Sequence, residues 1–176
     1  MFKMIIRPEK DQYYLDIAKV VSTRSTCLKI MMGAIIVKED QIIATGYVGA
    51  PRHTKSSLEH NFCLREKLGI RSGTQYELCR SVHAEQNAII NAARSGVSLL
   101  GGDIFIYGES RKNGEVANAF PCFICKKMLI NCGLKRCISS TTDQNQPFKI
   151  FLVEELADEW KNRDIIEDKY KYGANG

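Results

Sequence analysis

Two pairs of residues have the types and the spacing that could do chemistry. His83 and Glu85 stand two positions apart, and Cys122 and Cys125 stand three positions apart, directly after Pro121. One imidazole and two thiolates are the soft nitrogen and sulfur donors that zinc prefers, and three protein ligands leave a fourth position for water. We therefore predict that His83, Cys122 and Cys125 bind a zinc ion.

Glu85 is the candidate catalytic residue. On a helix its side chain would lie about 200° around the axis from that of His83, so the carboxylate need not bind the same ion. Zinc lowers the pKa of a bound water from about 15.7 toward about 7, and a nearby carboxylate can take a proton from that water and pass it to a substrate. The alternative from another class is a non-catalytic zinc module, in which both motifs serve only stability or partner binding. Such a closed site would have four protein ligands and no use for a free carboxylate.

Both motifs are expected to open helices, in a chain whose apolar spacing alternates between helices and strands. A helix N-terminus stabilises thiolates and an incoming anion. Asp11 is the expected N-cap of the first helix, and Gly133 is expected to end the third. The spacing predicts helices at 12–22, 83–94, 122–131 and 154–168, and strands at 33–37, 41–47, 103–107, 135–139 and 148–153. Helices interleaved with strands imply an α/β fold, with helices on both faces of a sheet.

Length and charge limit the class of protein. The chain has 176 residues, of which 44% are hydrophobic, and this fits a single globular domain over 1–176. It has no apolar run long enough for a membrane-spanning helix and no signal-like start, so the expected compartment is the cytoplasm. The net charge of +5 suits an anionic small molecule and is too weak to predict nucleic-acid binding. The segment from about 154 to 176 is expected to be a charged, solvated tail.

A long polar segment, at about 49–82, interrupts this alternation. Loops of this length without structure of their own are uncommon in a compact domain, so we expect something to hold it in place. A second, structural zinc site could do so, built from three thiols and one imidazole: Cys27, Cys63, Cys79, and His60 or His53. The alternative is that Cys27 is a small buried residue and that the other two cysteines are incidental loop thiols.

Around these motifs the sequence resembles the cytidine and deoxycytidylate deaminases, and the overall pattern is closest to the dCMP deaminases. The segments 81–89 and 121–125 carry the likeness, together with flanking pieces at 24–27, 33–37 and 44–47. H-x-E combined with P-C-x-x-C is the signature of the zinc deaminases. The resemblance implies a three-layer α/β/α fold with a mixed five-stranded sheet, and hydrolytic loss of the exocyclic amine from a cytosine ring.

The same resemblance implies roles for individual residues. His83, Cys122 and Cys125 would bind the catalytic zinc, Glu85 would shuttle protons, and the backbone N–H of Ala84 would hold the ring carbonyl. Some dCMP deaminases bind a second zinc through cysteines near those of the long polar segment. Relatives complete their active sites across subunit contacts, so a homo-oligomer is expected.

The expected reaction converts dCMP and water to dUMP and ammonia. The alternative is the same chemistry on a free nucleoside, a purine or pterin base, or a tRNA adenosine. Val48 stands where the dCMP deaminases usually carry the asparagine of Gly-Tyr-Asn-Gly. The regulatory nucleotide site of some members involves the region of Tyr47, so feedback control by dCTP or dTTP is not assumed.

Arginine recognises phosphate oxygens bidentately, so arginines are candidates for binding a substrate phosphate. Four are considered: Arg24, Arg52, Arg65 and Arg80. Arg24 is the leading candidate, because it precedes the Ser-Thr-Cys piece that resembles the family. Tyr47 could stack on the base.

Overall fold

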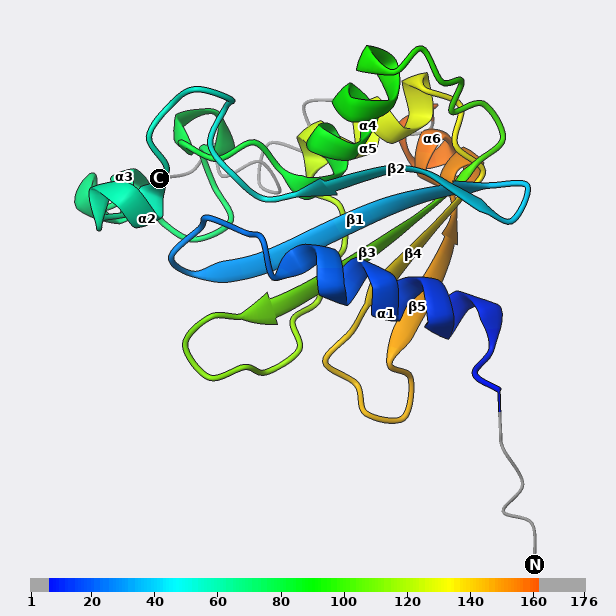
Figure 1. Cartoon of the computed structure of the whole chain (residues 1–176), viewed down its shortest axis with the longest axis horizontal. Coiled ribbons are helices and arrows are strands. Elements are labelled where there is room, and N and C mark those ends of the chain that lie inside the picture. The colour runs from blue at the N-terminus through cyan, green and yellow to red at the C-terminus, as the bar shows by residue number, and fades with distance from the viewer. Residues whose placement is uncertain (1–6, 162–176) are drawn as a thin grey trace, which may run out of the picture.

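A mixed five-stranded sheet forms the centre of the molecule in the computed structural model, which describes residues 7–161 (Figure 1). The strands are β1 (Ile30–Lys38), β2 (Gln41–Tyr47), β3 (Asp103–Ser110), β4 (Arg136–Ser140) and β5 (Phe148–Leu152). Their order in the sheet is β2-β1-β3-β4-β5. The β3–β4 pair is parallel, and the other three pairs are antiparallel.

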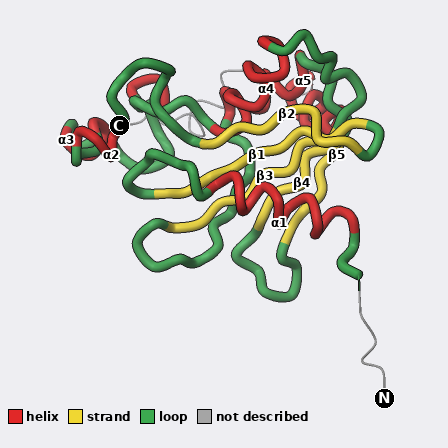
Figure 2. Tube along the Cα trace, viewed as in Figure 1, coloured by secondary structure: helices red, strands yellow, loops and turns green. Residues whose placement is uncertain are grey.

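Helices cover both faces of this sheet, as Figure 2 shows. Among residues 7–161, one face carries α1 (Lys10–Ser22), and the other carries α4 (Ala84–Arg94), α5 (Phe123–Asn131) and α6 (Val153–Lys161). The predicted three-layer α/β/α fold is therefore confirmed. No helix within residues 7–161 is long and apolar enough to cross a bilayer.

The two layers of helix explain why the central strands are continuously apolar. In β1, Ile35 packs in the cluster under α1, whereas its neighbour Ile36 packs in the cluster under α4 and α5. In β3, Phe105 and Ile106 divide between the two clusters in the same way. Because successive side chains of a strand point to opposite faces, a strand covered on both sides must be apolar at every position.

Two glycines allow the helices to approach the sheet closely. A Cβ at Gly46 in β2 would collide with the backbone of Ala84 and Ala88 in α4. A Cβ at Gly33 in β1 would collide in the same way with the backbone of Ala18 in α1. The close approach at Gly46 fixes the height of the first turn of α4 above the sheet, and that turn carries the His83 motif.

The predicted elements are present, with shifted ends. β1 begins three residues before the predicted 33, and β3 runs to Ser110, because Ile30 pairs with Ser110 and extends both strands. The predicted N-cap of the first helix is wrong: Glu9 occupies that position, and the Asp11 carboxylate instead accepts hydrogen bonds from Arg136. Of the predicted helix at 154–168, the part beyond 161 lies outside the described residues.

Short helices and one arginine order the long polar segment. Its elements, which the sequence did not predict, are α2 (Ser57–His60), α3 (Leu64–Lys67) and the 3-10 helix η1 (Tyr76–Leu78). Ser56 and Glu59 form a capping box at the start of α2. In α3, Arg65 donates from Nη2 to the carbonyl oxygens of Arg71 and Thr74, at 2.9 and 2.5 Å. These hydrogen bonds order the segment internally, and the expectation that something ties it to the rest of the domain stays a prediction.

Candidate metal centre and active site

Two helix N-termini bring the predicted zinc ligands together. His83 is the N-cap of α4, Cys122 is the N-cap of α5, and Cys125 lies in the first turn of α5. Nδ1 of His83 lies 3.3 Å from Sγ of Cys122 and 3.4 Å from Sγ of Cys125. The three ligand atoms all lie within 4.8 Å of one another. Residues about 40 positions apart in the chain thus face a common point.

This trio fits a zinc ion in both chemistry and spacing. A tetrahedral zinc with Zn–N bonds of about 2.0–2.1 Å and Zn–S bonds of about 2.3 Å holds N and S about 3.5 Å apart. The two observed N–S distances lie close to that value. Within the described part of the chain, no fourth His, Cys, Asp or Glu joins the group. Three protein ligands with a free fourth position are typical of catalytic zinc sites.

The trio already favours a thiolate. A hydrogen bond from Cys125 and the neighbouring His83 lower the pKa of the Cys122 thiol to about 4, against the opposing effect of burial. Burial acts to lower the pKa of His83, but the hydrogen bond to Cys122 and the charge of Glu85 outweigh it and raise that pKa. A thiolate is the form of cysteine that binds metal, so the site is electrostatically suited to a cation.

Glu85 is a buried carboxyl group that interacts electrostatically with all three members of the trio. Its side chain is buried, with only 2% of its surface exposed, and burial raises its pKa. Among residues 7–161, its Oε2 atom has no hydrogen-bond partner. A buried polar atom without a partner is costly and therefore rare, and such groups are concentrated where function requires them. This arrangement suits a group that exchanges a proton with a ligand; the catalytic role of Glu85 stays a prediction.

Three contacts fix the first turn of α4. The backbone N–H of His83 donates to Oε1 of Gln86 at 3.0 Å, which caps the helix. Nδ2 of Asn87 donates to the carbonyl oxygen of Tyr47 at 2.7 Å, which ties the helix to the end of β2. The strand-like pair Gly49 and Val82 exchange two backbone hydrogen bonds, of 3.1 and 2.8 Å, just before His83. Gln86 and Asn87 were not singled out from the sequence, where a helix cap and a strand anchor cannot be told from ordinary surface amides.

A cavity of about 220 Å³ opens beside His83. Tyr76 forms part of its wall and meets the His83 ring edge-on, with ring centroids 5.0 Å apart. On Tyr76 in turn lies the guanidinium of Arg65, 4.8 Å from the ring centroid. The sequence did not indicate a role for Tyr76, because no motif connects the long polar segment to the imidazole that it contacts.

The three predicted substrate-binding residues differ in burial and in the elements that carry them. Ala84 is the first residue of α4 and is fully buried, and its N–H lies in the turn that His83 begins. Tyr47 ends β2 and is 37% exposed. Arg24 is exposed after the end of α1. The binding roles of these three residues stay predictions.

The proposed second zinc ligands are not gathered in this structure. Among residues 7–161, His83, Cys122 and Cys125 are the group of three or more potential ligands that the geometry brings together. Cys27 Sγ instead accepts a hydrogen bond from the N–H of Lys29 at 3.4 Å. The remaining members are spread along the long segment: Cys63 caps α3, Cys79 follows η1, and His60 ends α2 beside Phe62. The second site stays a prediction without a ligand cluster behind it.

Comparison with known proteins identifies relatives of most of the chain. Residues 8–141 match the family model described as "Cytidine and deoxycytidylate deaminase zinc-binding region". Deoxycytidylate deaminase of Schizosaccharomyces pombe is 29% identical over 136 residues, which are 77% of this chain and 38% of that protein. Deoxycytidylate deaminase of Mycobacterium phage D29 is 30% identical over 137 residues, which are 75% of this chain and 94% of that protein.

A solved structure extends the likeness to three dimensions. It is the crystal structure of dCMP deaminase from the cyanophage S-TIM5 in complex with dCMP and dUMP, with 28% identity and a TM-score of 0.54. The match covers 74% of this chain and 80% of that one. The chain spans about two fifths of the length of two yeast relatives. It covers 38% of the Schizosaccharomyces pombe enzyme and 39% of the deoxycytidylate deaminase of Saccharomyces cerevisiae.

Proposed function

Because this chain belongs to the cytidine and deoxycytidylate deaminase family, we propose that it is a zinc-dependent hydrolase that converts dCMP and water to dUMP and ammonia. The observation that carries the proposal is the buried Glu85 beside the ligand trio: within residues 7–161, its Oε2 atom has no hydrogen-bond partner and the trio has no fourth protein ligand. A purely structural metal site would be closed by a fourth protein ligand.

His83, Cys122 and Cys125 hold the metal in this proposal. Zinc, when bound there, supplies Lewis acidity that makes water a usable nucleophile near neutral pH. The thiolate of Cys122, with its lowered pKa, offers a ligand that need not first lose a proton at neutral pH.

Glu85 moves the protons. Its carboxylate accepts a proton from the attacking water and delivers it to the ring nitrogen N3, while the new C4–O bond forms. A second proton then passes through Glu85 to the exocyclic nitrogen, and the C4–N bond breaks to release ammonia. Burial raises the pKa of Glu85 above its ordinary value, which favours the protonated form that a proton donor needs.

The backbone positions the base. The N–H of Ala84 is one of the unpaired donors in the first turn of α4 and would donate to the ring carbonyl O2. Tyr47 ends the strand next to the helix, and its ring is available to pack on the nucleotide. Val48 can supply only its backbone, and that backbone is engaged with Met32 and Thr26.

The finer assignments belong to the same proposal. We expect one deaminase domain, acting on a small nucleotide in the cytoplasm, as a homo-oligomer. All seven cysteines are free, which suits a reducing compartment. Light scattering of the purified protein measures the number of subunits, and a monomer with full activity would contradict the expected assembly.

An ammonia-release screen tests the proposed reaction. Purified, zinc-loaded protein is assayed with dCMP, deoxycytidine, cytidine, adenine and guanine, with and without a chelator. We expect release from dCMP with the highest kcat/KM, and loss of activity on chelation. No release from dCMP together with clear turnover of cytidine or guanine would overturn the substrate assignment.

A further inference from the structure

The cavity beside His83 has one permanently cationic residue in its wall. Arg80 lines this space together with His83, Gln86 and Tyr76, and Glu77 is the acid on the same wall. The remaining lining is small, apolar or uncharged: Pro51, Cys79, Ser81, Val82 and Ile124. A ligand anion that enters beside the metal centre therefore meets Arg80 as its main source of positive charge.

The structure separates the four arginines that the sequence left as phosphate candidates. Arg52 donates from Nη2 to Oδ1 of Asn91 at 2.8 Å, and Asn91 in turn donates to the carbonyl oxygen of Thr45 in β2. Arg65 uses its guanidinium to hold the long polar segment and to cover the Tyr76 ring. Neither of these, nor Arg24, lines the cavity that contains His83. Of the four, Arg80 alone does so.

The guanidinium of Arg80 is held at one end and free at the other. Nε donates to the carbonyl oxygen of Lys55 at 2.5 Å. No other hydrogen bond or ion pair of Arg80 is present among the described residues, so both Nη groups are available. A guanidinium that is anchored through Nε presents two parallel N–H donors, the geometry that matches two phosphate oxygens.

Arg80 and the candidate metal ligand His83 line the same cavity and are close in the chain. Arg80 precedes His83 by three residues, and the paired backbones of Gly49 and Val82 fix the link between them. In a 5′-nucleotide the phosphate is at the opposite end from the base. Of the three candidate metal ligands, His83 lines this cavity, whereas Cys122 and Cys125 do not. A base amine held at the metal centre would therefore meet the cavity at His83, and the phosphate, at the other end of the nucleotide, would reach the part of the wall that contains Arg80.

We propose that Arg80 binds the 5′-phosphate of the substrate and makes the site select a nucleotide over a nucleoside. This assignment rests on the proposed deamination in one respect, which is that the base occupies the metal centre. It adds the residue that recognises the other end of the substrate, and so a physical basis for choosing dCMP over deoxycytidine.

Calorimetric binding of the product tests this without relying on turnover. Zinc-loaded full-length wild type and Arg80→Gln are titrated with dUMP and with 2′-deoxyuridine. Loss of charged hydrogen bonds should raise the Kd for dUMP about 10- to 100-fold, and leave the Kd for deoxyuridine within about twofold. Arg80→Lys should recover part of the dUMP affinity. Arg94→Gln, at the exposed end of α4, is the matched loss of one charge and should leave both affinities unchanged.

Several results would overturn the proposal. These are equal affinity of the wild type for dUMP and deoxyuridine, unchanged dUMP binding in Arg80→Gln, equal weakening of both ligands in that variant, or a selective loss in Arg24→Gln instead. A wild type that binds dUMP through Arg80 but releases no ammonia from dCMP would keep the phosphate site and refute the proposed reaction. The two claims can therefore fail separately.

Discussion

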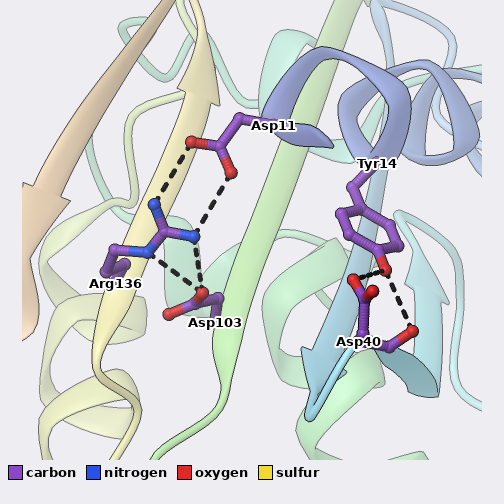
Figure 3. Close-up of polar contacts among 5 residues, drawn as sticks. All are labelled: Asp11, Tyr14, Asp40, Asp103 and Arg136. Atoms are coloured by element: carbon purple, nitrogen blue, oxygen red, sulfur yellow. Dashed lines mark hydrogen bonds and ion pairs between the residues drawn. The ribbon is translucent and has the colours of Figure 1, made fainter. Parts of the chain in front are cut away.

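Two clusters of polar side chains in this molecule are built on opposite principles. The first is the candidate metal centre, where one nitrogen and two sulfurs face a common point and Oε2 of Glu85 has no partner in the described chain. The second, shown in Figure 3, lies beside the start of α1 and consists of Asp11, Tyr14, Asp40, Asp103 and Arg136. In the second cluster, donors are matched to acceptors within the protein itself.

Arg136 is the centre of that second cluster. Its Nε and Nη2 donate to Oδ2 of Asp103 at 3.0 and 2.7 Å, and its Nη1 and Nη2 donate to the Asp11 carboxylate at 3.2 Å each. The guanidinium on β4 thereby joins α1 to β3 (Figure 3). The hydrogen bond to Asp103 is the main reason that the pKa of Arg136 is raised further.

Tyr14 and Asp40 form the other half of the cluster. The Tyr14 hydroxyl donates to Oδ1 of Asp40 at 2.7 Å, and Lys10 binds Oδ2 at 2.6 Å. Asp40 lies in the two-residue turn between β1 and β2, where both Glu39 and Asp40 have positive φ. These bonds therefore stabilise a hairpin turn that lacks the glycine such turns favour.

The difference between the clusters indicates that the second one contributes to stability, whereas the first one is suited to chemistry. Asp103 also has a buried oxygen without a partner, but its other oxygen accepts two bonds from Arg136. Glu85 makes no such bidentate ion pair among the residues described, although the charge of His83 acts to lower its pKa, and it is more deeply buried than Asp103. A satisfied network holds elements together, whereas a buried carboxyl group beside a cluster of metal donors is costly unless a ligand completes it.

Removing a metal ligand should have the largest effect. Cys122→Ala should reduce the zinc content from about one ion per chain to near zero and abolish ammonia release, because two donors cannot hold a tetrahedral zinc tightly. Zinc is measured by mass spectrometry of the dialysed protein. Cys132→Ala, at the other end of α5, is the control and should keep both zinc and activity. Full zinc content in Cys122→Ala would remove this residue from the site.

Replacing Arg136, the centre of the second cluster, should lower stability and leave zinc binding and turnover unchanged. Arg136→Met leaves the Asp11 and Asp103 carboxylates without their cation, and should lower the free energy of unfolding by about 1–3 kcal/mol. Denaturant titration measures that loss, while zinc content and kcat of the folded variant stay at wild-type levels. A variant with normal stability and reduced zinc would reverse the roles assigned to the two clusters.

The smallest effect is expected from Tyr14→Phe, which removes one hydroxyl from the same cluster. Hydrogen bonds from Lys10 and Tyr14 lower the pKa of Asp40. The stability that they contribute is present above the ordinary pKa of 3.8 and is lost as the pH falls through the lower, folded value. The unfolding midpoint of Tyr14→Phe should therefore lie slightly below that of the wild type at neutral pH and converge with it in acid. A difference that grows in acid would contradict this assignment.

Local patterns predicted much of the molecule. The charged turn between β1 and β2, and the helices that begin after His83 and Cys122, follow from apolar spacing over a few neighbouring residues. The zinc trio was also predictable, because its donor types are rare and the two short motifs each place them at a helix N-terminus.

Contacts between distant segments could not be predicted in this way. Asp11 and Arg136 are 125 residues apart, so the local pattern suggested a helix cap for Asp11 instead of an ion pair. Nothing near Tyr76 indicated that it would meet His83, and Arg80 could not be preferred among four arginines until the cavity was known. These placements depend on the strand order and on the path of the long polar segment, which no short window of sequence contains.

The most direct test of the account compares zinc content and turnover in Glu85→Gln. The amide keeps the shape of the side chain but cannot carry the proton, so kcat for dCMP should fall about 10²- to 10⁴-fold while zinc stays at about one ion per chain. Equal zinc content with this loss of turnover would support a metal centre whose buried acid does the proton transfer. Wild-type turnover in Glu85→Gln would contradict it.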